Sequence, residues 1–127
     1  VRRDRDTGFV TERSWYWRNQ LHRPNDEPAM LEYSEKSGKL IRRHWLLHGE
    51  YARSNEQPHM EWVDEETGVM TRAEYRLKTS PGKRSQLHRE AGPALLLFDR
   101  LTGEQIEAHF YRFGHKQVVS QGPSLKP

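Results

Sequence analysis

Two histidine–arginine pairs are the residues of this sequence best suited to acid–base chemistry. His22-Arg23 and His88-Arg89 each have a glutamate nearby in the sequence, and imidazole and carboxylate groups are common proton donors and acceptors in enzymes. The alternative is structural, because side chains that recur at one place in a repeat can brace a turn through hydrogen bonds to the backbone. We favour the structural role, since both pairs occupy the same place in the repeat described below.

The remaining histidines and the lack of cysteine argue against a metal site. His44 and His48 are four residues apart, which is about 13 Å along a strand and too far for one zinc ion. His44 and His109 occupy the same position in repeat units that are not neighbours. The sequence contains no cysteine, so it offers neither a disulfide nor a thiolate ligand or nucleophile. Gly-rich phosphate loops, nucleophile elbows and zincin motifs are also missing from it.

Three sets of residues recur along the chain, and they reveal the elements that carry these side chains. Within each set two steps are 30 residues long and one is 35 residues long. The sets are the glycines Gly8, Gly38, Gly68 and Gly103, the prolines Pro28, Pro58, Pro93 and Pro123, and an aromatic column of Trp15, Trp45, Tyr75 and Phe110. Such periods are typical of arrays in which each unit packs against its neighbours. We predict a single repeat domain over 1–127, with units at approximately 1–30, 31–60, 61–95 and 96–127.

Each unit is predicted to contain two strands and two turns. Side chains in GVMTRAEYRL, residues 68–77, alternate with the period of a half-buried strand rather than of a helix. A shorter second strand, such as ALLLF at 94–98, is followed by a polar turn whose glycine suits a positive φ angle. The connection to the next hairpin ends in a proline. We predict an all-β fold, an elongated antiparallel meander of about four repeated β-hairpins with about eight strands in one twisted sheet.

The order of residues within a unit resembles the variant MORN-type repeats of bacterial and viral proteins. The best match is QLHREAGPA at 86–94, and QLHRPNDEPA at 20–29 is next. The second unit departs from the pattern with Ala52-Arg53, and the fourth departs further with Gln117-Val118. This resemblance implies an elongated sheet of stacked hairpins that binds proteins or lipids without catalysis. Small bacterial proteins of this kind also resemble antitoxin or immunity partners of secreted toxins.

The composition is that of a thin, surface-rich protein. Charged residues make up 31% and hydrophobic residues 33% of the chain, so a thick two-layer core would be hard to fill. The net charge is only +3, and the basic residues are interleaved with acidic ones, which is weak evidence for nucleic-acid binding. No apolar run approaches the roughly 20 residues of a membrane span, and no signal-peptide core is present. We expect a cytoplasmic protein without a transmembrane segment.

Binding residues are expected where equivalent positions of the units differ, because a scaffold requirement would make those positions alike. The column shared by all units is scaffold on this reasoning. The face opposite the column varies and mixes Tyr, Arg and His, as protein interfaces do, although a merely solvated face is the alternative. The insertion KTSPGKR at 78–84 is a second candidate because it breaks the repeat. The predicted partner-binding residues are Tyr16, Arg18, His44, Leu46, Arg72, Arg76, Lys83, Arg84 and Tyr111.

These features predict a non-catalytic protein-binding module. The repeat geometry offers no second layer that would form a pocket and no point where titratable side chains converge, so we expect no enzymatic activity, no cofactor and no metal. With the resemblance above, the expected partner is a cognate bacterial toxin that this chain neutralises as an immunity or antitoxin protein. Self-association through open strand edges is a further expectation. The alternative function is binding of an anionic surface, nucleic acid or a phosphoinositide membrane, through Arg42, Arg72, Arg76, Lys83 and Arg84.

Overall fold

The computed structural model describes residues 1–77 and 84–118, which form sixteen β-strands and no helix. One large sheet contains β1 (Arg2–Arg3), β2 (Val10–Ser14), β5 (Met30–Tyr33), β6 (Leu40–His44), β9 (Met60–Val63), β10 (Met70–Glu74), β13 (Leu95–Phe98) and β14 (Gln105–His109). Four short hairpins pair β3 (Tyr16–Trp17) with β4 (Gln20–Leu21), β7 (Leu46–Leu47) with β8 (Glu50–Tyr51), β11 (Arg76–Leu77) with β12 (Gln86–Leu87), and β15 (Tyr111–Arg112) with β16 (His115–Lys116). The predicted all-β antiparallel meander is confirmed.

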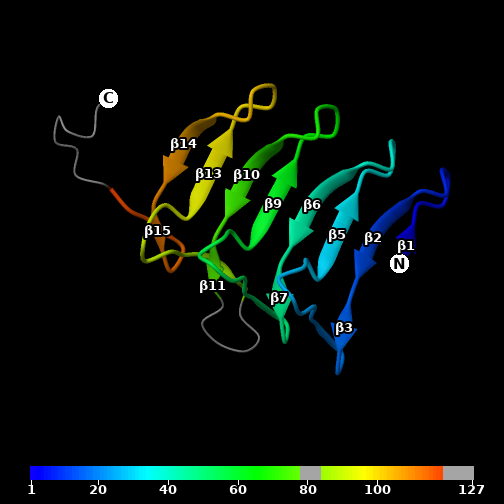
Figure 1. Cartoon of the computed structure of the whole chain (residues 1–127), viewed down its shortest axis with the longest axis horizontal. Helices are drawn as coiled ribbons and strands as arrows, with labels where there is room; N and C mark the ends of the chain where they lie inside the picture. Colours follow the sequence, from blue (N-terminus) through cyan, green and yellow to red (C-terminus); the bar gives the residue numbers. More distant parts are fainter. Residues whose placement is uncertain (78–83, 119–127) are drawn as a thin grey trace.

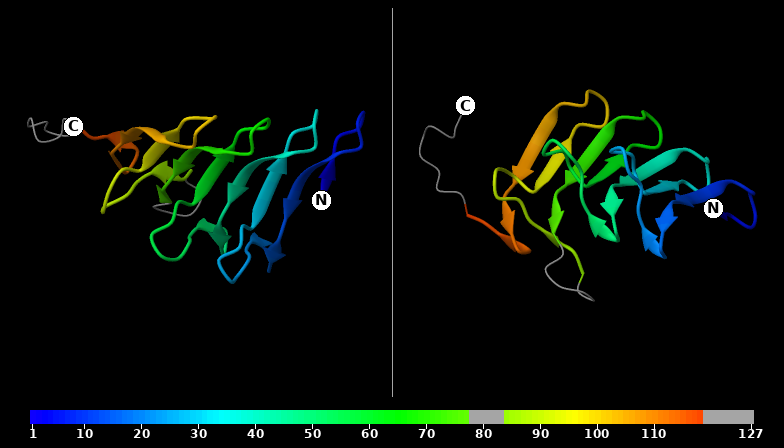
Figure 2. Two further views of the ribbon diagram at one scale, coloured as in Figure 1. Left: turned by 45° about the horizontal axis from the view of Figure 1, so that its top comes forward. Right: turned by 60° about the horizontal axis from the view of Figure 1, so that its bottom comes forward.

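The strands of the large sheet lie side by side in the order of the chain, and neighbours are antiparallel. Figure 1 shows β1 and β14 as the outermost strands of this sheet. The short hairpins form a second row beyond one end of its strands. Figure 2 shows the same two rows from two other directions. Each repeat therefore contributes strands to the large sheet and a short hairpin to the second row. Among the described residues there is no helix that is long and apolar enough to cross a membrane.

The structure corrects the prediction of one continuous strand through the column residue. The predicted strand is split into β10 and β11, with Tyr75 between them. The N–H of Tyr75 donates to the carbonyl of Ala94 (2.8 Å) in the large sheet, whereas its own carbonyl accepts the N–H of His88 (3.0 Å) beside the short hairpin. Trp15 and Trp45 make the same exchange. The strand changes partner at this residue because two different segments pair with its two halves. The segment before the His-Arg pair, β12, pairs with β11, and the segment after it, β13, pairs with β10.

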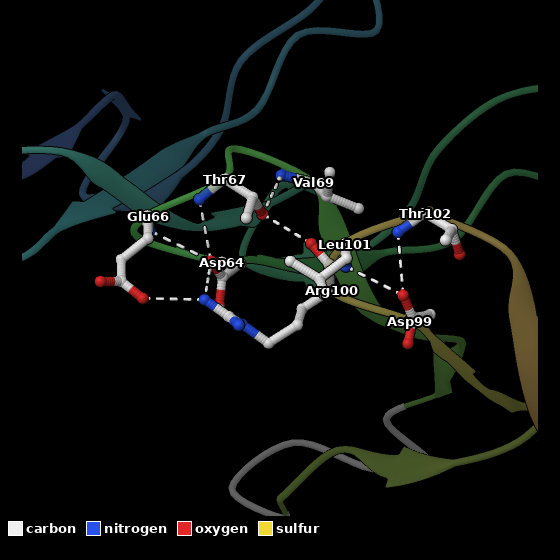
Figure 3. Close-up of polar contacts among 8 residues, drawn as sticks. All are labelled: Asp64, Glu66, Thr67, Val69, Asp99, Arg100, Leu101 and Thr102. Carbon is white, nitrogen blue, oxygen red and sulfur yellow. Dashed lines mark hydrogen bonds and ion pairs between the residues drawn. The ribbon is translucent and has the colours of Figure 1, made fainter.

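The tips of the large hairpins have the turn chemistry that the sequence predicts. The tip glycines have φ angles of 77°, 75°, 76° and 80° at Gly8, Gly38, Gly68 and Gly103, respectively. Asp64 Oδ2 accepts the backbone N–H groups of Glu66 (3.1 Å) and Thr67 (2.9 Å), and Asp99 closes the next tip in the same way (Figure 3). These side-chain caps satisfy turn donors that the sheet cannot pair.

Side chains also tie neighbouring tips together. Arg100 Nε lies 3.0 Å from Asp64 Oδ1, and Arg100 Nη2 lies 2.8 Å from Glu66 Oε1 (Figure 3). In the other direction, Thr67 Oγ1 donates to the carbonyl of Arg100 (2.8 Å). The Arg100 hydrogen bond and the backbone N–H of Thr67 lower the pKa of Asp64 to about 2.

The apolar core lies in the middle of the array. Its buried members are Ala29, Trp45, Leu46, Met60, Ala73, Tyr75, Ala94 and Leu95. At the ends, β1 is exposed and so are all residues of β14 except His109. Repeat units bury one another's faces, so the outermost strands lack cover on one side. Among the described residues, β1 and β14 each pair with a single strand.

Candidate binding surface

On the column side, arginines from the connections cover the aromatic rings. Arg23 lies on Trp15, Arg53 on Trp45 and Arg89 on Tyr75, with guanidinium carbons 3.9, 3.6 and 3.9 Å from the ring centroids. Each of these arginines also donates a hydrogen bond from Nη1 to the carbonyl of the proline that ends its own connection. The distances are 3.3 Å for Arg23, 3.0 Å for Arg53 and 3.2 Å for Arg89. Stacking and hydrogen bonding together hold each connection against the column. The turn-bracing role predicted for Arg23 and Arg89 is thereby confirmed, and Arg53 has the same role.

The histidines of the pairs brace the next unit. His22 Nδ1 accepts the N–H of His48 (2.9 Å), and His88 Nδ1 accepts the N–H of Phe113 (3.0 Å). Ring centroids in these two contacts are 4.4 and 4.3 Å apart. The sequence did not suggest the approach of His22 to His48, because it arises from packing between units. Within residues 1–77 and 84–118, no three potential metal-ligating side chains lie together.

The face opposite the column is internal at its centre, which differs from the expected exposed surface. His44 and Leu46 are only 6% and 5% exposed. A side chain from the short hairpin row contributes to this cover: the hydroxyl of Tyr51, from β8, lies 3.2 Å from His44 Nδ1. His44 and Leu46 are not accessible as surface contacts in this arrangement.

Titratable side chains also converge on this face, contrary to expectation. His44 joins Glu32 Oε1 through Nε2 (2.6 Å) and the Tyr51 hydroxyl through Nδ1 (3.2 Å). The order hydroxyl, imidazole, carboxylate is that of an activated nucleophile. Burial, however, raises the pKa of Tyr51, whereas the hydrogen bond from His44 lowers the pKa of Glu32. The raised pKa of Tyr51 favours its protonated form, and the lowered pKa of Glu32 favours its charged form.

Glu74 organises the neighbouring unit. Its side chain is 1% exposed and lies 2.6 Å from Arg72 Nη2 and 2.6 Å from Arg76 Nη2. A buried carboxylate requires such partners, because an unpaired charge in the interior is strongly destabilising. Arg72 and Arg76 were predicted to contact a partner or an anionic surface. Much of their charge is already compensated within the protein.

An arginine–tryptophan–arginine row runs across the large sheet. Arg42, Trp62 and Arg72 are register partners on β6, β9 and β10, and the two guanidinium carbons lie 5.5 and 5.1 Å from the Trp62 ring centroid. Glu32 Oε1 holds Arg42 Nε at 2.6 Å. All three members of the row are partly exposed. The row is an accessible surface whose side chains are already ordered.

Sequence reasoning missed Trp62, although the repeat contained a signal for it. The equivalent positions in neighbouring units hold Glu32 and Leu97. This position therefore differs between units, as the positions on the first strands do. The predicted binding residues lie on the first strands and in the insertion, whereas Trp62 lies on β9, a second strand.

The other predicted residues occupy separate places. Tyr16, Arg18 and Arg84 are exposed, and Tyr111 is half-buried. Arg18 lies in a hairpin turn with its guanidinium carbon 4.4 Å from the ring centroid of Trp17. Lys83 and most of the predicted insertion lie outside the described residues. The structure thus brings together Arg72, Arg76 and the surroundings of His44, but it does not gather all the predicted residues into one patch.

In chemical terms, the accessible part of this face offers stacking area and hydrogen-bond donors. Comparisons of the chain with protein-family models, with curated proteins and with solved structures found no match.

Proposed function

We propose that this chain is a non-catalytic, MORN-like repeat scaffold that binds a protein partner through the Arg42–Trp62–Arg72 row. The supporting observation is that the row is partly exposed yet held by internal ion pairs, Arg42 to Glu32 and Arg72 to Glu74. Tryptophan and arginine dominate the energetic centres of protein interfaces. Side chains that are ordered before binding lose less conformational entropy when a partner docks.

The partner in this proposal is a toxin that the chain neutralises in the cytoplasm as an immunity or antitoxin protein. The family resemblance of the repeat supports this role. The charge of the row also bears on the partner, because each arginine is paired with a glutamate and the surface carries little excess charge. Such a surface suits a partner of mixed charge. It is less suited to a phosphate-rich membrane or nucleic acid, whose binding depends on uncompensated basic residues.

Co-purification with the product of the neighbouring gene tests the proposal. We expect a stable complex whose affinity falls at least about 30-fold in Trp62→Ala, the loss of about 2 kcal/mol typical of an interface centre. Trp17→Ala is the matched control, since Trp17 is an exposed tryptophan of the short hairpin row and should leave the affinity unchanged. Circular dichroism must show that both variants remain folded.

A growth assay completes the test. Cells that express the neighbouring gene product alone should stop growing, and co-expression of this chain should restore growth, whereas co-expression of Trp62→Ala should restore it less. If the neighbouring product is lethal with or without the chain, the immunity role is wrong. If Trp17→Ala and Trp62→Ala weaken the complex equally, the row is not the binding site.

A further inference from the structure

Two equivalent cavities lie on the column side, each between one connection and the next unit. The first has a volume of about 220 Å³ and includes Trp45, Leu47 and Arg53 in its lining. The second has a volume of about 330 Å³ and includes Tyr75, Leu77 and Arg89 at the equivalent positions. Ligand pockets commonly begin at about 300 Å³. The repeat therefore supplies two versions of one cavity, whose differences can be compared residue by residue.

The arginines that line the first cavity are paired with carboxylates of the protein itself. Arg23 Nη2 lies 3.0 Å from Glu27 Oε1, and Arg53 Nη1 lies 3.0 Å from Glu61 Oε2. Asp26 also lines this cavity, with its Oδ2 atom 4.0 Å from Arg53 Nε. The protein itself thus occupies the positions from which an external anion would bind.

The second cavity, which Arg53 also lines, has one carboxylate fewer. Gln57 stands where the first cavity has Glu27, so one negative charge is replaced by a neutral amide. Arg89 makes only one ion pair with the described residues, between Nη2 and Glu56 Oε1 at 4.0 Å, and the Glu56 side chain is 72% exposed. The guanidinium of Arg89 is held flat on Tyr75. Glu56 also lines this cavity, but at 4.0 Å it leaves the Arg89 charge only weakly compensated.

His59 adds a hydrogen-bond donor to the same cavity. Its Nδ1 atom accepts the N–H of Arg76 (2.8 Å), so a neutral ring carries its proton on Nε2. Burial, and then the charge of Arg53, lower the pKa of His59 and keep the ring neutral. An anion in the cavity would favour the protonated ring and would raise this pKa.

We propose that the second cavity is a binding site for a carboxylate group, held by Arg89 Nη2 and His59 Nε2. The planar, two-oxygen shape of a carboxylate matches a fixed guanidinium. The group could be the side chain of an aspartate or glutamate on a protein partner, or a free carboxylate. Only the first of these sources rests on the proposed function, because binding of the group itself requires no protein partner.

Titration of the isolated protein with N-acetyl-glutamate N-methylamide, followed by NMR of the His59 imidazole, tests this site. We expect a saturable shift and a raised His59 pKa, neither of which sodium chloride of equal ionic strength produces. Gln57→Glu, which copies Glu27 of the first cavity, should weaken binding about tenfold or more, since it places a negative charge at the site.

The proposal is overturned if sodium chloride produces the same shift or if Gln57→Glu binds as tightly as the parent protein. Tighter binding of inorganic phosphate than of the carboxylate would overturn the carboxylate assignment and indicate a phosphate site. Carboxylate binding without a complex in the co-purification assay would leave the site intact and contradict the proposed function. A protein complex whose affinity is unchanged by Gln57→Glu would show that the partner does not supply the carboxylate.

Discussion

On one face of the large sheet the units repeat the same side chains, and on the other face each unit carries its own. The column face stacks an arginine on an aromatic ring in three successive units. The opposite face holds Ser14, His44, Glu74 and His109 at one repeated position. Both faces are nevertheless buried at the centre of the array, since Trp45, His44 and Glu74 are all below one-tenth exposed.

Variation between repeats does not by itself identify a binding surface. His44 differs from Glu74, but each is matched by its own neighbours, Glu32 and Tyr51 for His44 and two arginines for Glu74. A buried polar side chain must have partners, and the partners change with it. The variable face is therefore a set of locally complementary networks at its centre, with the Arg42–Trp62–Arg72 row accessible beside them.

Removal of a column ring should have the largest effect on stability. Trp45→Ala would leave a cavity under Arg53 and remove the hydrogen bond from the indole N–H to the carbonyl of Asp26 (3.0 Å). We expect a loss of about 4 kcal/mol in the free energy of unfolding, measured by chemical denaturation. Phe110→Ala is the control, because Phe110 is 37% exposed at the end of the column and should cost less than half as much. Equal losses in the free energy of unfolding would mean that burial by neighbouring units does not determine how much a column ring stabilises the fold.

Neutralising the buried carboxylate on the variable face should have the next largest effect. Glu74→Gln would leave Arg72 and Arg76 without their common partner, and we expect a loss of about 3 kcal/mol in the free energy of unfolding. The double variant Glu74→Leu/Arg76→Leu places an apolar residue beside Leu95, the register partner of Glu74, and leaves only the partly exposed Arg72 without its carboxylate. It should lose less than Glu74→Gln alone. If the double variant is the less stable of the two, the ion pairs contribute more than their burial costs.

A smaller effect is expected at the edge of the other network. Tyr51→Phe removes the hydroxyl that lies 3.2 Å from His44 Nδ1 while it keeps the ring, so the free energy of unfolding should fall by about 1 kcal/mol. Tyr16→Phe alters an exposed hydroxyl and serves as the control, with no expected change. A neutral result for Tyr51→Phe would show that the His44 network contributes nothing measurable to the variable face.

The smallest effect should lie outside both faces, at the tips. Because the pKa of Asp64 is lowered from 3.8 to about 2, its carboxylate stabilises the fold above about pH 4, and this contribution is lost as the pH falls through 2. Asp64→Asn should therefore unfold more easily than the parent at pH 7, and the difference should vanish near pH 2. Asp99→Asn, at a tip whose aspartate has no direct arginine contact among the described residues, should change less at pH 7.

The repeat, the strand positions and the turn chemistry were determined by the sequence itself. Alternating side chains, recurring glycines and prolines, and the arginines beside them act over a few residues, so they can be read without knowledge of the fold. They predicted the meander, the positive φ angles of the tip glycines and the bracing arginines. The split of each first strand was missed, because it depends on where the partner segment leaves the sheet.

Only the tertiary structure decided which side chains are accessible and which charges are compensated. Burial of His44, Leu46 and Glu74 depends on neighbours from other strands, such as Tyr51 beside His44. The contrast between Glu27 and Gln57 is visible in the sequence, but its meaning comes from two cavities formed between units. Solvent exposure and electrostatic compensation are set by neighbours in space, and residue type and spacing alone do not specify those neighbours.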